Sequence, residues 1–207
     1  MAIATTNEIN DLFETLGEPE SPVDGQRVND TERRAMWAWT ALRLLLGWSL
    51  LWAFLDKFFG LGFATCRAAE SAAIDFGCDA AMVNGGSPTY GFLNFGTQGS
   101  HTGFLFDWMA PSAPDAINLA DVGFMAVLLL GGLALMLGIG VRTAALGGAL
   151  LMAFMFLAGD VWPDNNPVNS SHIIEMVAFI GIAIVGAGPF ALQRWVNKNI
   201  PLLARIP

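Results

Sequence analysis

Four long apolar segments, separated by charged or glycine-rich stretches, constrain this chain more than any other feature of its sequence. A helix needs about 20 residues to cross the hydrocarbon core of a bilayer, or about 17 at the short end. Four segments are long and apolar enough to cross, although the fourth is short: 36–59, 117–137, 141–158 and 172–187. A mean hydropathy of +0.52 is also too apolar for an ordinary soluble domain. The sequence predicts an all-α membrane protein, a bundle of four transmembrane helices.

The basic residues mark one side of the predicted bundle. They precede the first span, lie in the turn between the second and third spans, and follow the fourth: Arg27, Arg33, Arg34, Arg142, Arg194, Lys198 and Arg205. Residues 60–116 contain only one base, Arg67, among several acids. By the positive-inside rule, both termini are predicted to be cytoplasmic and the long loop to lie outside. We expect a multi-pass protein of a bacterial plasma membrane.

The chain divides into a membrane domain and two tails. Residues 1–34 are polar and acidic, which predicts a largely disordered cytoplasmic tail, although residues 5–17 have the spacing of a short amphipathic helix. Residues 35–196 form the predicted membrane domain, whose outer loop covers 60–116, and residues 197–207 form a cytoplasmic C-terminal tail. The sequence has no basic patch of the kind that binds nucleic acid.

The outer loop contains the only two cysteines, Cys66 and Cys78. In an oxidising exterior such a pair predicts a disulfide, which closes a loop of about 13 residues and contributes ~3 kcal/mol in the chain-entropy model. A Cys-x-x-Cys pair is absent, which favours a structural bridge over a catalytic dithiol. The loop is also rich in phenylalanine. It is therefore expected to pack across the outer mouth of the bundle or to dip into the interface, with His101 as a surface histidine.

Ionisable side chains at the outer ends of the predicted spans should lie at one membrane depth. They come from all four spans: Asp56, Lys57, Asp121, Asp160, His172 and Glu175. The i to i+3 spacing of His172 and Glu175 places both on one helix face. A carboxylate beside an imidazole can orient it and raise its basicity, an arrangement suited to moving protons. Asn165 and Asn166 add amide groups above this layer.

One interpretation of this layer is a pocket for a quinone head group. His172 and Glu175 then handle protons, and the pocket is formed with Asn165, Asn166 and Asp121. Lys57 or Arg43 holds an oxyanion or a quinone carbonyl, and Asp56 is a further candidate contact of the substrate. The other interpretation is structural, because polar residues also gather where water begins, and Lys57 paired with an acid can fasten two helices. No metal is expected, since two ligands without a further histidine nearby support one only weakly.

Arg43 is the exception to the outer layer. It lies about 10 Å into the first span from the cytoplasmic side, by the helical rise. No carboxylate of the sequence is expected at matching depth. Two readings remain open: the side chain snorkels to inner-leaflet phosphates, or it faces the bundle and binds an anion or carbonyl.

Several stretches between about residues 40 and 195 resemble the DoxX family of four-helix membrane proteins, in particular its DoxD-like members. The stretches are "ALRLLLGWSLLWAFLDKFFGLGFAT", "VNGGSPTYGFL", "LALMLGIGVRTAALGGALL", "NNPVNSSHIIEM" and "GAGPFALQRW". DoxD-like proteins are described as the large subunit of a thiosulfate:quinone oxidoreductase. The resemblance implies a quinone-coupled redox role, with quinone as co-substrate, thiosulfate as donor and no covalently bound cofactor. The region from Cys66 to Cys78 and the acidic tail depart from the family pattern.

Two hypotheses for the function follow. The first is a quinone-coupled membrane subunit of the kind that the resemblance implies. The second is a non-catalytic accessory or assembly subunit of a larger respiratory or redox complex, which the absence of haem, flavin, iron–sulfur and copper motifs supports. A small-solute transporter ranks third, because the spans lack paired broken helices.

Overall fold

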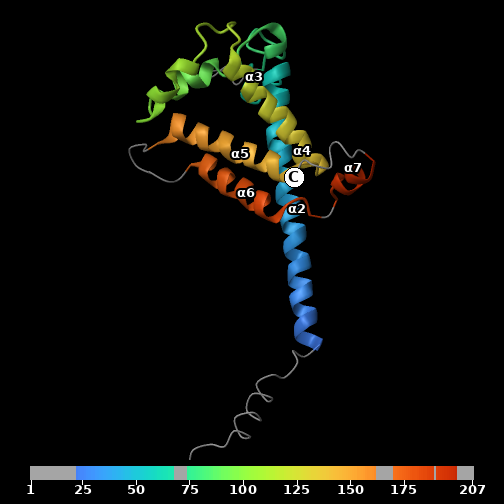
Figure 1. Ribbon diagram of the computed structural model, residues 1–207. Helices are drawn as coiled ribbons and strands as arrows, with labels where there is room; N and C mark the ends of the chain where they lie inside the picture. The colour runs from blue at the N-terminus through green and yellow to red at the C-terminus, as the bar shows by residue number, and fades with distance from the viewer. Residues whose placement is uncertain (1–21, 68–73, 162–169, 189, 200–207) are drawn as a thin grey trace, which may run out of the picture. The chain divides into compact units, whose positions relative to one another are not determined.

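The computed structural model describes residues 22–67, 74–161, 170–188 and 190–199 (Figure 1). The chain forms two units, Met1–Ala38 and Trp39–Pro207. Within the described ranges the regular structure is helical, and the only strand-like feature is an isolated bridge between Arg67 and Ile74. The prediction of a helical protein is confirmed.

Helix α2, Pro22–Phe59, begins well before residue 36, where the sequence predicts the first span to start. Proline suits the first turn of a helix because its φ is already fixed near the helical value. Within the first unit, Arg33 donates to Asp30 at 2.9 Å one turn away. Part of the expected tail, from residue 22 to 34, is therefore helical. The amphipathic helix expected over residues 5–17 lies outside the described residues.

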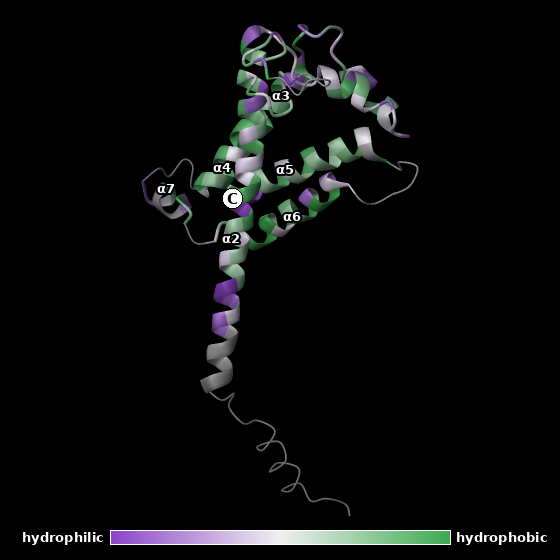
Figure 2. Ribbon diagram, turned by 180° about the vertical axis from the view of Figure 1, so that it is seen from behind, coloured by the Kyte–Doolittle hydropathy of each residue, from purple (hydrophilic) through white to green (hydrophobic). Residues whose placement is uncertain are grey.

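Among the described residues, three helices are long and apolar enough to cross a membrane. The first is Asn29–Phe59 of α2. The second, Leu119–Leu137, consists of α3 (Leu119–Ala126), the π-helical turn η4 (Val127–Gly131) and α4 (Gly132–Leu137). The third, Val141–Gly159, consists of α5 (Val141–Met155) and most of the π-helical turn η5 (Phe156–Asp160). Hydrophobic residues dominate α4 and α5 in Figure 2. The chain is a multi-pass membrane protein that would sit in a lipid bilayer.

A fourth apolar helix, α6 (Ser171–Val185), has 15 residues. At 1.5 Å per residue it is about 22 Å long, which is less than the ~30 Å of a typical hydrocarbon core. It runs beside α5 (Figure 1). Its outward-facing side chains, such as Ile174 and Ile184, are exposed and apolar, as expected of a lipid-facing surface.

Glycines let these helices approach closely. A Cβ on Gly132 of α4 would lie 2.8 Å from the backbone nitrogen of Leu51 in α2, and one on Gly148 of α5 would lie 2.7 Å from the ring of Phe179 in α6. Neither glycine has room for a side chain, so both act in packing, because small residues let helix backbones approach closely. Phe179 itself is fully buried in the hydrophobic core.

Short helical segments lie between and after the spans: η1 (Met82–Asn84), η2 (Phe92–Gly96), η3 (Gly103–Met109) and α7 (Gln193–Asn199). Segments η2 and η3 pack against η5. Ser100 and Thr102 both donate to the Leu157 carbonyl, and the rings of Phe106 and Phe154 are 6.3 Å apart. The loop therefore covers the end of the bundle where α2 ends and α3 begins, which we call the Lys57 end. The opposite end, at the turn between α4 and α5, is the Gly138 end.

The predicted disulfide is present. Cys66 and Cys78 are bonded, with their Cα atoms 5.6 Å apart. The backbone nitrogen of Asp75 also donates to the Cys66 carbonyl at 3.0 Å. The bridge thus closes the part of the loop that directly follows α2.

Candidate functional site

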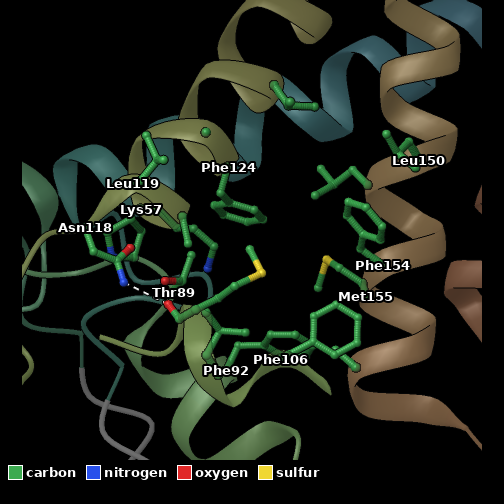
Figure 3. Close-up of a pocket in the computed structure, with 18 of the residues that line it drawn as sticks. Lys57, Thr89, Phe92, Phe106, Asn118, Leu119, Phe124, Leu150, Phe154 and Met155 are labelled. Carbon is green, nitrogen blue, oxygen red and sulfur yellow. Dashed lines mark hydrogen bonds between the residues drawn. The ribbon is translucent and has the colours of Figure 1, made fainter. Parts of the chain in front are cut away.

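A cavity of about 640 Å³ opens between α3 and α5 at the Lys57 end, beneath the loop (Figure 3). Ligand pockets of small molecules commonly fall in this range of volume. Its lining is almost entirely apolar: Lys57, Pro88, Thr89, Phe92, Leu93, Phe106, Trp108, Met109, Asn118, Leu119, Ala120, Gly123, Phe124, Val127, Gly147, Leu150, Leu151, Phe154, Met155 and Ala158. Several lining residues are strongly exposed, including Leu119 at 86% and Trp108 at 82%. The cavity therefore opens on an exposed, apolar part of the surface.

Among the described residues of this lining, Lys57 alone is ionisable. Its ammonium lies 6.0 Å from the centroid of the Phe124 ring, which also lines the cavity. This is about the outer limit for a cation–π interaction. Within the part of the chain that the structure describes, Lys57 makes no ion pair. An ammonium in an apolar cavity is suited to a ligand that brings its own carbonyl or carboxylate oxygen.

Polar groups at the cavity edge are already engaged. The Asn118 side chain donates to the Met109 carbonyl at 2.8 Å, which ties the start of α3 to η3 (Figure 3). The Thr89 hydroxyl donates to Asp121 at 2.7 Å. These bonds stabilise the cavity wall. Among the described lining residues, Lys57 is therefore the main group that can donate a hydrogen bond to a ligand.

Asp56 precedes Lys57 but faces a different neighbourhood, because successive residues of a helix point in directions about 100° apart. Its carboxylate is 1% exposed and accepts hydrogen bonds from three backbone amides: Phe63 at 2.8 Å, Ala64 at 3.0 Å and Thr65 at 3.0 Å. All three amides belong to the turn that leads to Cys66. Asp56 thus anchors the loop and does not line the cavity.

Asp121 is fully buried and has four hydrogen-bond donors. It accepts from the Ser87 hydroxyl at 2.8 Å, from the backbone nitrogen and hydroxyl of Thr89, and from the backbone nitrogen of Asn118. The Asn118 side chain accepts in turn from the Asp121 nitrogen, which completes a capping box at the start of α3. The carboxylate joins α3 to the loop and holds Thr89 at the cavity edge.

His172 and Glu175 do not line the cavity. His172 lies in the first turn of α6, where its ring nitrogen is 3.4 Å from the hydroxyl of the N-cap residue Ser170. Glu175, one turn further, is half-buried. Among the described residues, neither contributes to the hydrogen bonds of Asp56 and Asp121. Asn165 and Asn166, the two asparagines of the predicted pocket, lie outside the described residues.

Arg43 lies at the other end of the bundle. It is fully buried, and its Nη2 donates to the Phe190 carbonyl at 3.3 Å. Arg43 is separated from Lys57 by about 21 Å along the helix, at 1.5 Å per residue. The structure therefore separates the two cations that the sequence offered as alternative contacts for one substrate.

Lys57 is a candidate site residue of the sequence and lies in the cavity lining, whereas most other lining residues were not predicted. Phe124, Phe154 and Met155 lie in apolar spans, where nothing in the sequence distinguishes a side chain that faces a cavity from one that faces lipid. Phe92 and Phe106 carried a signal, since both belong to a loop too apolar to be freely solvated.

The chain was also compared with known proteins. No family model, curated protein or solved structure matches it.

Proposed function

We propose that this protein binds a lipid-soluble quinone in the cavity at the Lys57 end. The observation that carries the proposal is a cavity of about 640 Å³ with a largely apolar lining and, among its described residues, a single ammonium group, which opens on an exposed apolar surface. A quinone has an apolar ring and tail and two carbonyl oxygens. Lys57 would donate to one carbonyl, while aromatic side chains such as Phe124 contact the ring.

The redox role rests on the resemblance to DoxD-like proteins. Two thiosulfate ions joined through a new sulfur–sulfur bond would release two electrons. The quinone would take up these electrons and two protons to become a quinol. Lys57 contributes by holding the carbonyl oxygen on which negative charge develops. Proton handling by His172 and Glu175 stays a prediction, because neither residue lines the cavity.

The proposal includes a membrane topology. We place α6 as a fourth, short span and both termini in the cytoplasm of a bacterial cell, as the distribution of basic residues predicts. The Lys57 end and its loop then face the exterior, where a disulfide between Cys66 and Cys78 is chemically favoured. In this orientation a quinone enters the cavity sideways from the outer leaflet.

Replacing the lysine tests the proposal. In full-length protein reconstituted in nanodiscs, Lys57→Met should weaken binding of a decyl-substituted benzoquinone by at least about tenfold, because hydrogen bonds to a charged group contribute about 1.5–3 kcal/mol. Lys57→Arg, which keeps a cationic donor, should retain most of the affinity. Binding can be followed by titration calorimetry.

Two controls test whether the effect is specific to Lys57 and to the quinone head group. Lys198→Met removes an exposed lysine of α7 and should leave the affinity unchanged. A decyl-substituted benzene without carbonyls should bind the wild type and Lys57→Met equally. Equal quinone affinity of the wild type and Lys57→Met would show that the cavity does not recognise a carbonyl oxygen through Lys57.

A non-catalytic accessory subunit is the second candidate. It is favoured by the exposed apolar side chains of η3, including Phe104 at 67% and Leu105 at 54%, beside the cavity. Asp56 and Asp121 also favour it, because their buried carboxylates hold the loop in place and thus have a structural role. Isolation of the intact chain in a mild detergent separates the candidates. Quinone reduction by the chain alone speaks for the first, and activity only in a complex with redox subunits speaks for the second.

A further inference from the structure

The guanidinium of Arg43 is buried without a full set of partners. The side chain is 0% exposed, and the single described acceptor is the Phe190 carbonyl, 3.3 Å from Nη2. In the described part of the chain, Nε and Nη1 have no hydrogen-bond partner. An arginine remains protonated in a protein, so this is a buried positive charge with unused donors.

The surrounding backbone is shaped around this group. A Cβ on Gly138 would collide with Nη1 of Arg43 and would lie 2.7 Å from the Cα of Ala191. Gly138 has a φ of +70°, which a residue with a side chain rarely adopts. The Leu192 nitrogen donates to the Leu137 carbonyl at 3.0 Å, which joins the segment after α6 to the same turn. Three segments thus enclose the guanidinium.

Among the described residues, no acidic side chain forms an ion pair with Arg43. The described acids of the unit that begins at Trp39 all belong to the loop or to span ends at the Lys57 end: Asp56, Asp75, Asp79, Asp107, Asp115, Asp121, Asp160 and Glu175. The one among these that belongs to α2, Asp56, is about 20 Å away from Arg43 along the helix at 1.5 Å per residue. At the Gly138 end the described charge is also positive, because exposed Arg142 lies in the first turn of α5. An uncompensated buried charge is costly, which favours a counter-ion from outside the chain.

We propose that Arg43 is the centre of an anion site that binds a phosphate group, either the head group of a phospholipid or free phosphate. The N–H groups of Nε and Nη1 donate to phosphate oxygens in charge-assisted hydrogen bonds. The long hydrogen bond from Nη2 to Phe190 is the contact that the anion would replace most easily. This site lies at the end of the bundle opposite the quinone cavity and does not depend on it.

The test uses full-length, delipidated protein in detergent. One arm adds inorganic phosphate and records the thermal unfolding midpoint. The other adds phosphatidylglycerol and counts retained lipids by native mass spectrometry. The wild type should be stabilised by phosphate, retain a lipid, or both. An effect of lipid alone identifies the head group as the source, and an effect of phosphate identifies the free anion.

Variants locate the site. Arg43→Met should lose the phosphate shift or the retained lipid, whereas Arg142→Met, a matched change of an exposed arginine at the same end, should keep them. Arg43→Lys keeps a cation but loses the guanidinium donors, so it should bind at least tenfold more weakly, and it serves as the main variant if Arg43→Met does not fold. Lys57→Met should bind phosphate and lipid normally, which separates this result from the fate of the quinone proposal.

The proposal is overturned if the wild type responds to neither ligand. It is also overturned if the Arg43 variants bind as the wild type does, or if Arg142→Met loses binding to the same extent as Arg43→Met.

Discussion

The Asp56 carboxylate accepts hydrogen bonds from three successive backbone amides, so a charge near the end of the first span is used to hold the chain that follows. Asp121 acts in the same way at the start of the second span, with donors from Ser87, Thr89 and Asn118. Lys57 differs from both because its ammonium faces an apolar cavity. At the residue scale, the ionisable groups of the Lys57 end thus divide into two anchors and one candidate ligand contact.

Asp56→Asn should destabilise the protein by about 1–3 kcal/mol, the cost of leaving buried polar groups unsatisfied. The asparagine amide would point N–H donors at backbone N–H donors, so at least one of the amides of Phe63, Ala64 and Thr65 loses its acceptor. The measurement is thermal unfolding in detergent, with hydrogen exchange of residues 63–65 as a local readout.

Asp79→Asn provides the matched control, because Asp79 is an exposed carboxylate of the same loop. It should leave the unfolding midpoint and the local exchange unchanged. Identical midpoints and exchange for wild type and Asp56→Asn would contradict the anchoring role of Asp56.

At the element scale, the helices are held together by close backbone approach. Gly47 of α2 and Gly132 of α4 face one another, and a Cβ on Gly132 would lie 3.0 Å from the Gly47 carbonyl oxygen. Within lipid, helix association relies on such packing, because lipid chains are as apolar as the side chains themselves. The glycines therefore decide how closely the first and second spans can approach.

Gly132→Ala should cost about 1–3 kcal/mol, as overpacking of a close contact does. The added methyl group would meet backbone atoms of α2, which cannot turn away as a side chain can. The free energy of unfolding can be measured by denaturant titration in mixed micelles.

Gly123→Ala is the control in the same span, since a Cβ at Gly123 has no heavy atom within 4 Å. It should be neutral or stabilising by up to about 1 kcal/mol, because alanine has the higher helix propensity. Equal destabilisation by the two substitutions would contradict close packing at Gly132.

At the scale of the whole molecule, the two ends of the bundle differ in chemistry. The Lys57 end has an apolar cavity under a disulfide-linked loop, and the Gly138 end has a buried guanidinium within a tight turn. If the protein spans the membrane as we propose, the two ends meet opposite faces of the bilayer. A ligand of one site then has no direct route to the other.

Cysteine labelling tests this topology. His101→Cys, in the exposed part of the loop, and Thr143→Cys, near the start of α5, should react with a membrane-impermeant maleimide from opposite sides of sealed vesicles. The two native cysteines form a disulfide and contribute no background. Labelling of both positions from the same side would contradict a single crossing of the membrane between the loop and α5.

The sequence predicted the helices better than the site. Spans ending at Phe59 and Leu137, and another beginning at Val141, were expected within a residue or two of their observed bounds, because apolar length is a local property. The helix over residues 22–34 was not expected, since its polar composition also suits a disordered tail. Lys57 was expected to lie beside His172 and Glu175, but only Lys57 lines the cavity. Residues of different helices can lie at the same membrane depth without facing one another.

The sequence by itself determined that this chain is helical and suited to lipid, where its apolar helices lie and that its two cysteines can pair. These properties follow from local composition, because a backbone in lipid must satisfy its own hydrogen bonds. Only the tertiary structure decided that Asp56 and Asp121 anchor a loop, that Lys57 faces a cavity and that Arg43 is buried beside Gly138. The hydrogen bonds of Asp56 span only seven to nine residues. The other outcomes depend on contacts between residues far apart in the chain, which the packing of helices and loop sets and no local pattern encodes.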